Sequence, residues 1–88
     1  MFFAYVIQSE IDGSLYKGHS EDLQRRLQQH NSGKTKSIKS KIPYILIYSE
    51  EFLTREESIK REKYFKTAAG RRFLNSKLSF NIQKFPKL

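Results

Sequence analysis

The sequence predicts a small α+β domain: a three-stranded antiparallel sheet flanked by helices, in the order β-β-α-β-α-α. Two tyrosine-bearing segments on either side of Asp12-Gly13 predict a hairpin, and a third apolar run follows Pro43. Helix-start signals precede the segments between and after these strands. The chain has 88 residues, which is the size of one domain with a thin core. We expect this domain to span residues 1–75, with residues 76–88 as a C-terminal tail.

The first two strands form the predicted hairpin. Phe2 to Gln8 is aromatic and contains β-branched residues, as strands typically do. Asp12-Gly13 is the strongest turn signal in the chain, and Ser14 to Gly18 returns as the second strand. Two tyrosines, Tyr5 and Tyr16, therefore come one from each strand.

The segment after the hairpin is expected to be a helix. Ser20 is the expected N-cap, and the acids Glu21 and Asp22 would lie in the first turn, where the helix dipole favours negative charge. The helix would end near His30 or Asn31, because Asn31-Ser32-Gly33 is a stop signal.

The inner face of this helix carries unusual residues. Core-facing positions recur at i, i+3, i+4 and i+7, and counted from the first leucine they hold Leu23, Arg26, Leu27 and His30. An inward-facing arginine is costly unless an anion or a polar cleft receives it. The phosphate of a nucleic acid is such an anion, and Arg25 is left to face solvent.

A basic loop and a third strand follow. Four lysines are spaced by small polar residues in the loop, at Lys34, Lys36, Lys39 and Lys41. This spacing fits a solvated loop and a loop that grips a nucleic-acid backbone equally well. After Pro43, the continuous apolar run from Tyr44 to Ser49 predicts a central strand that is buried on both faces.

The last third of the chain is expected to be helical. Thr54 and Glu57 form a capping box for a helix that runs to about Lys66. The segment from Thr67 to Gly70 is expected to be a break or a tight link, followed by a short helix from Arg71 to Asn75. Whether residues 76–88 dock on the core is left open by their pattern.

The charge balance indicates a polyanionic partner. There are 17 Lys and Arg residues against 9 Asp and Glu residues, a net charge of +8, which favours nucleic acid. The absence of cysteine excludes disulfides and thiolate zinc sites, and it is consistent with the cytoplasm. No apolar run approaches the roughly 20 residues of a membrane span. Met1 to Ile7 lacks a basic segment and is too short for a signal peptide.

Several short motifs occur in a characteristic order. They are Phe3-Ala4-Tyr5, Tyr16-Lys17-Gly18, Asp22-Leu23-Gln24-Arg25-Arg26-Leu27 followed by His30, and Arg61-Glu62-Lys63-Tyr64-Phe65-Lys66. From about Phe3 to Leu74 the chain resembles the GIY-YIG nuclease superfamily, and most of all its small stand-alone single-domain branch. It departs from the family pattern where Phe3-Ala4 replaces Gly-Ile and Lys17 replaces the usual aliphatic residue.

The resemblance implies metal-dependent hydrolysis of phosphodiester bonds in DNA. Arg26 would bind the scissile phosphate, and Glu62 would hold Mg²⁺ or Mn²⁺. Tyr5 or Tyr16 would position or deprotonate the attacking water, and His30 would relay a proton or orient a tyrosine. A free tyrosine has a pKa near 10, so a tyrosine base requires nearby positive charge.

Other residues receive narrower expectations. We expect a nucleic-acid backbone to contact Lys17, Arg25, Lys34, Lys36, Lys39 and Lys41. His19 has no partner at helical spacing and is read as a loop residue, and neither Asn75 nor Asn81 is assigned the role of a family asparagine. The protein is expected to be a monomer or weak homodimer without a membrane partner. The alternative is a nucleic-acid-binding module without catalysis, and the substrate structure and the pathway, DNA repair among others, stay open.

Overall fold

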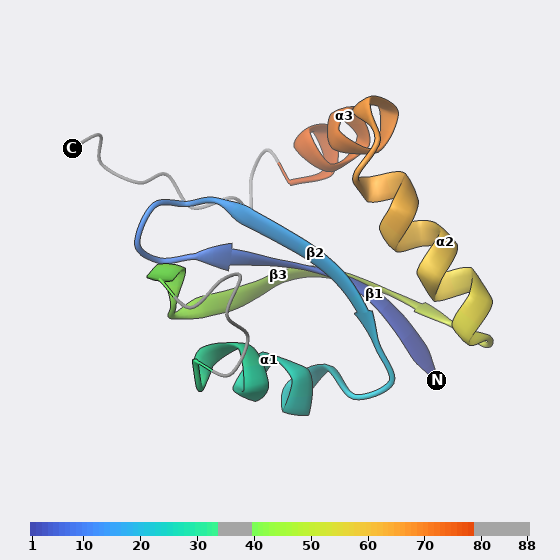
Figure 1. Cartoon of the computed structure of the whole chain (residues 1–88). Helices are drawn as coiled ribbons and strands as arrows, with labels where there is room; N and C mark the ends of the chain where they lie inside the picture. The colour runs from blue at the N-terminus through green and yellow to red at the C-terminus, as the bar shows by residue number, and fades with distance from the viewer. Residues whose placement is uncertain (34–39, 79–88) are drawn as a thin grey trace.

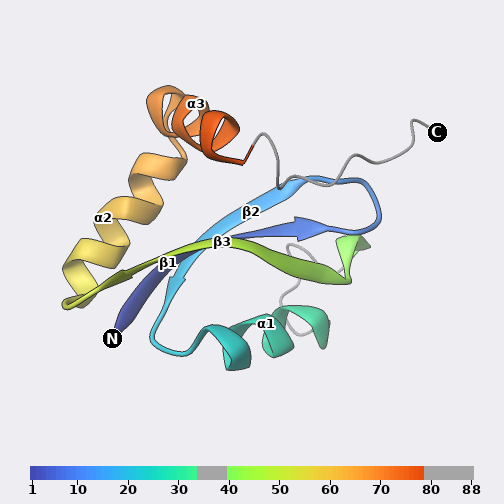
Figure 2. The same cartoon turned by 180° about the vertical axis from the view of Figure 1, so that it is seen from behind.

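The computed structural model describes residues 1–33 and 40–78. A three-stranded antiparallel sheet lies between one helix on one face and two helices on the other (Figures 1 and 2). The elements are β1 (Phe2–Ser9), β2 (Leu15–Ser20), α1 (Leu23–Asn31), β3 (Tyr44–Phe52), α2 (Arg55–Phe65) and α3 (Ala68–Lys77). This order confirms the predicted α+β fold class.

The predicted hairpin is present. The backbone N–H of Gly13 donates to the Ser9 carbonyl at 3.0 Å, and Gly13 has a φ of 78°, a conformation that glycine adopts without steric cost. The turn sets the register of the hairpin, in which Tyr5 lies opposite Gly18 and Ile7 lies opposite Tyr16. Side chains on one face of a strand recur at every second residue, so Tyr5, Ile7, Tyr16 and Gly18 share one face.

The strand order corrects one prediction. The sheet has the order β2-β1-β3, so β1 is the central strand and β3 lies at an edge, not at the centre as the apolar run had suggested. β3 also continues to Phe52, three residues beyond the predicted end at Ser49. A register shift near Ile47 lets Ile47 and Tyr48 pack on the same core, while Leu46 is 41% exposed. The apolar run therefore reflects this irregular register and not burial on both faces.

The two faces of the sheet bury different residues. Ala4 and Val6 of β1 pack with Phe65, Leu74 and Leu78 beneath α2 and α3. On the opposite face a second cluster lies under α1; it consists of Tyr5, Ile7, Tyr44, Tyr16, Leu23, Leu27 and Ile42. Each face therefore has its own small core, and the central strand contributes to both.

Helix α1 begins later than predicted. Its N-cap is Asp22, whose Oδ1 accepts the Arg25 backbone N–H at 3.1 Å, and no acid lies in its first turn. Ser20 instead ends β2, and its hydroxyl oxygen accepts the Asp22 backbone N–H at 3.0 Å. Serine and aspartate are both favourable N-caps, so composition alone did not separate the two positions.

The capping box of α2 is confirmed, with Thr54 and Glu57 satisfying each other's backbone N–H groups. Helix α3 is longer than predicted because Thr67 caps it, accepting the Gly70 N–H at 3.0 Å. The expected break at residues 67–70 is therefore the N-cap and first turn of a helix that continues to Lys77. The expectations for the tail beyond residue 78 lie outside the described residues. Within the described ranges, no helix combines the length and the apolar surface that crossing a bilayer requires.

Candidate active site

Tyr5, Tyr16 and His30 form a cluster between the sheet and α1, which we call the tyrosine–histidine cluster. The Tyr5 hydroxyl oxygen lies 2.8 Å from Nε2 of His30. Tyr5 is 2% exposed and His30 is completely buried. The Tyr16 ring meets the His30 ring edge-on, with centroids 4.9 Å apart. The hairpin and the last turn of α1 thus bring together three of the residues that the sequence analysis selected.

Burial favours the neutral forms of this cluster. It lowers the pKa of His30, and the charge of Arg26 adds to the effect. It also raises the pKa of Tyr5, although Arg26 opposes that shift. The cations of the chain therefore do not by themselves turn Tyr5 into a phenolate. A neutral imidazole has one donor and one acceptor nitrogen, so His30 can accept the Tyr5 proton in one of its tautomers.

The position of the Tyr5 ring depends on Gly18, its cross-strand partner in β2. A Cβ atom at residue 18 would lie 2.5 Å from the Tyr5 hydroxyl oxygen and 2.6 Å from Cζ. Only a residue without a side chain lets the Tyr5 ring extend across the edge strand. This role of Gly18 was not predicted from the sequence, although the Asp12-Gly13 turn implies that Gly18 pairs with Tyr5.

Arg26 lies beside the tyrosine–histidine cluster. Its side chain is partly buried, whereas Arg25 is exposed. Its Nη1 donates to Oε1 of Gln29 at 3.1 Å, and the neighbouring Tyr5 hydroxyl raises the pKa of the guanidinium. Because a guanidinium has five N–H donors, Arg26 retains donors for an anionic ligand.

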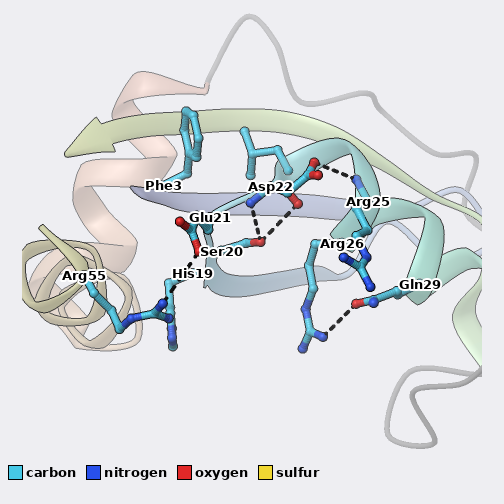
Figure 3. A pocket seen from close by; sticks show the side chains of 10 residues that line it. Phe3, His19, Ser20, Glu21, Asp22, Arg25, Arg26, Gln29 and Arg55 are labelled. Carbon is cyan, nitrogen blue, oxygen red and sulfur yellow. Dashed lines mark hydrogen bonds and ion pairs between the residues drawn. The ribbon is translucent and has the colours of Figure 1, made fainter. Parts of the chain in front are cut away.

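An open pocket of about 840 Å³ lies beside Arg26, between the start of α1 and the start of α2 (Figure 3). Three arginines line it, Arg25, Arg26 and Arg55, together with Phe3, His19, Ser20, Glu21, Asp22, Leu23 and Gln29. In Figure 3 the side chains of His19 and Arg26 extend toward the same side of the pocket. The pocket is therefore a concave surface next to the cluster, in which three arginines face two carboxylates and Arg55 lies 3.7 Å from Glu21.

Glu62 lies on α2, facing strand β2, and both of its carboxylate oxygens have partners. His19 Nδ1 lies 2.6 Å from Oε1, and Lys66 Nζ donates to Oε2 at 2.6 Å. Burial by itself would raise the pKa of Glu62, but the hydrogen bonds and charges of Lys66 and His19 outweigh it and lower the pKa. The carboxylate is therefore ionised, as a cation ligand must be.

The expectation that His19 lies in a loop is wrong. His19 belongs to β2, opposite Ala4 of the central strand. Its partner Glu62 is 43 positions away in the sequence, so no local spacing indicated the contact. The alternation of β2 was the available signal, because it places Lys17 and His19 on the face opposite Tyr16 and Gly18.

The candidate residues thus lie on both faces of the sheet. Tyr5, Tyr16, Arg26 and His30 belong to the α1 face, whereas Glu62 approaches from α2. Glu62 is close enough to Tyr5 to contribute to raising its pKa. Because β2 is an edge strand, no further strand of the sheet separates the two groups.

Glu62 is compatible with a divalent cation. The ammonium of Lys66 already occupies a cation position on Oε2. Across residues 1–33 and 40–78, no three His, Cys, Asp or Glu side chains are grouped so that they could share a metal. A single carboxylate suits Mg²⁺, which keeps several waters and takes further ligands from phosphate oxygens.

The remaining predicted residues are dispersed. Lys17 is partly buried, and burial lowers its pKa, with Arg71 and Lys66 adding to the effect. Lys41 lies near the hairpin turn, 3.3 Å from Asp12. Asn75 is exposed on α3. Three predicted contacts, Lys34, Lys36 and Lys39, lie outside the described residues, and so does Asn81, which received no role.

Comparisons with known proteins find a family model, relatives and a solved structure that are similar to this chain. Residues 1–75 match the family model described as the GIY-YIG catalytic domain. The chain is 40% identical to the UPF0213 protein SAG0778 of Streptococcus agalactiae serotype V over 65 residues, 73% of each chain. It is 41% identical to the UPF0213 protein SERP0126 of Staphylococcus epidermidis over 66 residues, 74% of this chain and 79% of the other.

A solved structure shares the fold. The solution NMR structure of the UPF0213 protein BH0048 from Bacillus halodurans superposes with a TM-score of 0.53 at 26% identity. The match covers 92% of this chain and 87% of the other. The likeness therefore extends over nearly the whole of both chains.

Proposed function

Because the chain belongs to the GIY-YIG family, whose domain has a nuclease fold, we propose that it is a metal-dependent endonuclease that hydrolyses phosphodiester bonds in DNA. The observation that carries this proposal is the 2.8 Å contact between the Tyr5 hydroxyl and the buried His30, with Arg26 beside it. A buried phenol paired with a neutral imidazole is an arrangement suited to moving a proton.

In the proposed reaction, Tyr5 receives a proton from the attacking water while its own proton passes to Nε2 of His30. The water oxygen then bonds to phosphorus, and the bond to the leaving oxygen breaks. Arg26 binds the non-bridging oxygens of the phosphate and stabilises the negative charge that develops on them. Tyr16 packs edge-on against His30 and would restrict the movement of the imidazole.

Glu62 is the proposed ligand of Mg²⁺ or Mn²⁺, at the carboxylate oxygen that Lys66 contacts. When bound, such a cation stabilises charge on the leaving oxygen and on the phosphate. The flanking DNA backbone would contact the cationic side chains near the β2 edge, which include Lys17 and Arg25. Whether residues 34–39 add contacts, and whether the chain acts as a monomer or weak homodimer, stay predictions.

Cleavage of a labelled DNA panel tests the proposal. Supercoiled, linear, branched and single-stranded DNA are incubated with Mg²⁺, Mn²⁺ or EDTA. We expect metal-dependent cutting of at least one substrate by the wild type. Removing a group that stabilises transition-state charge typically lowers the rate by about 100-fold or more, so Arg26→Ala and Glu62→Gln should show at least that loss.

Each variant has a matched control, in which an exposed residue of the same type is substituted in the same way. Glu56→Gln removes one carboxylate from the same helix, and Arg72→Ala removes one exposed guanidinium from α3. Both controls should cut at nearly the wild-type rate. Equal residual cutting by wild type, Arg26→Ala and Glu62→Gln would identify the activity as contamination and contradict the proposal.

One observation favours a second candidate, a nucleic-acid-binding module without catalysis. Both oxygens of Glu62 have protein partners, so a cation must displace Lys66 before it can bind. This candidate predicts DNA binding that weakens steeply with salt and leaves the DNA intact after long incubation with Mn²⁺. Clean cleavage would exclude it.

A further inference from the structure

The His19–Glu62 contact gives a role to a residue that the proposed mechanism does not use. We propose that His19 is a positioning residue that fixes one oxygen of Glu62, while Lys66 holds the other oxygen in the place that the divalent cation takes. The inference rests on the proposed function, because it deepens the role of Glu62 there.

His19 is well placed to hold a carboxylate. It lies on a strand that pairs with the central strand, and its cross-strand partner Ala4 is completely buried. A glutamate side chain has three rotatable bonds, so its carboxylate is poorly oriented as a cation ligand unless another residue holds it. The 2.6 Å contact from His19 Nδ1 to Oε1 removes much of this freedom. Hydrogen bonds of this kind typically alter metal affinity by about 10-fold to 100-fold.

Lys66 differs from His19 in mobility. Its side chain is 55% exposed and lies one helical turn after Glu62. A lysine–carboxylate pair with an exposed ammonium contributes little to stability, so the ammonium can leave at small cost. The two oxygens of Glu62 therefore differ: Oε1 is held by a residue of the sheet, and Oε2 is covered by a cation that can be exchanged.

The contact itself has a spectroscopic signature that needs no metal. If Nδ1 of His19 donates to Glu62, a neutral His19 carries its proton on Nδ1 and a free lone pair on Nε2. Long-range nitrogen–proton NMR spectra distinguish this tautomer. We expect the Nδ1–H form in the wild type, and loss of that preference in Glu62→Ala, which removes the acceptor, but not in Glu56→Ala.

Manganese binding is the second measurement. The protein without DNA is titrated with Mn²⁺, and paramagnetic broadening of backbone amide signals around residue 62 gives the affinity. We expect His19→Ala to weaken Mn²⁺ binding about 10-fold. His19→Asn, whose side-chain amide offers an N–H at nearly the position of Nδ1, should recover most of the loss. Lys66→Met should tighten binding several-fold, whereas Lys63→Met removes the same charge from the same helix and should change binding less.

The outcomes separate this inference from the proposed function. If wild type and His19→Ala bind Mn²⁺ equally at residue 62, His19 has no positioning role, whatever the cleavage assay shows. If Lys63→Met tightens Mn²⁺ binding as much as Lys66→Met, the change in net charge explains the effect. The proposal that the cation replaces Lys66 on Oε2 is then wrong. If the wild type neither binds Mn²⁺ at residue 62 nor cuts DNA, the proposed function fails and the inference fails with it.

Discussion

The two faces of the sheet bury different kinds of side chain. Under α2 and α3 the core is apolar, with Phe65, Leu74 and Leu78 at its centre, although Ser58 of α2 is also buried. Under α1 the buried set includes an imidazole and a phenol, and Nδ1 of His30 has no hydrogen-bond partner among the described residues.

Oε1 of Gln8, on the same side of β1 as Ala4 and Val6, is also buried without a described partner. A buried polar atom without a partner lowers stability, so both faces carry such a cost. Under the proposed function, the difference is that only the α1 face buries reactive groups among its polar side chains.

Two glycines, one for each face, make this comparison testable. Gly70 lies where α3 packs against the end of α2, and a Cβ atom there would be 1.7 Å from the Tyr64 carbonyl oxygen. Gly18 lies on β2, and its added Cβ would meet the Tyr5 side chain. A side chain can move aside more easily than a backbone, so the same substitution should have different consequences at the two positions.

Gly70→Ala should have the largest effect. The backbone of the α2–α3 junction must shift to admit the methyl group, and overpacking of this kind costs about 3 kcal/mol or more of the free energy of unfolding. Urea denaturation followed by circular dichroism measures the loss. The exposed Ala69 one residue earlier provides the control, because Ala69→Ser changes the same helix without such a clash. Equal stability of Gly70→Ala and the wild type would show that the α2–α3 junction can admit a methyl group without cost, which would contradict the close packing at Gly70.

Gly18→Ala should affect activity more than stability. The methyl group displaces the Tyr5 ring, so we expect a cost of about 1–3 kcal/mol in the free energy of unfolding and a large loss of cleavage. Tyr5→Leu removes the ring, and in that background the stability cost of Gly18→Ala should fall by more than half. Thermal melting of the four proteins in this cycle measures the coupling. An unchanged cost in the Tyr5→Leu background would mean that the two residues do not meet.

The smallest expected effect is a pH dependence that arises from the α1 face. Burial lowers the folded-state pKa of His30 below its unfolded value of about 6.5. Below pH 6.5 the unfolded chain binds a proton that the folded chain does not, so the free energy of unfolding decreases as the pH falls, by at most about 1.4 kcal/mol per pH unit. His30→Gln should remove this part of the slope between pH 6.5 and 5. A slope unaltered by the substitution would place its origin elsewhere.

Much of the fold was predictable because its signals are local. The Asp12-Gly13 turn and the Thr54–Glu57 capping box each act within a few residues, and both are present as predicted. The order of strands in the sheet was not predictable from the apolar run of β3. A run of apolar residues indicates that a strand is partly buried. It does not show whether the strand lies at the centre of the sheet or at an edge with a register shift. The N-cap of α1 was misplaced because two favourable caps, Ser20 and Asp22, stand two positions apart.

In the candidate site, too, local features could be predicted from the sequence and long-range contacts could not. Tyr5, Tyr16, Arg26 and His30 come together because the hairpin and one helix follow each other in the sequence, and their spacing could be read directly. The partners of Glu62 required the packing of α2 on β2, which joins residues far apart in the chain. The pattern of alternating residues could have placed His19 on the correct face, but not at a hydrogen-bonding distance from one particular carboxylate.

The position of Glu62 has a consequence for how the protein is made. Ribosomes add the hairpin and α1 first, and Glu62 is added only after about two thirds of the 88 residues. A chain that ends before α2 lacks Glu62 and also lacks Phe65, Leu74 and Leu78, which cover the other face of the sheet. Under the proposed function, the last helices therefore complete the core and supply the cation ligand in the same step, so hydrolysis would begin only when α2 docks against the edge strand.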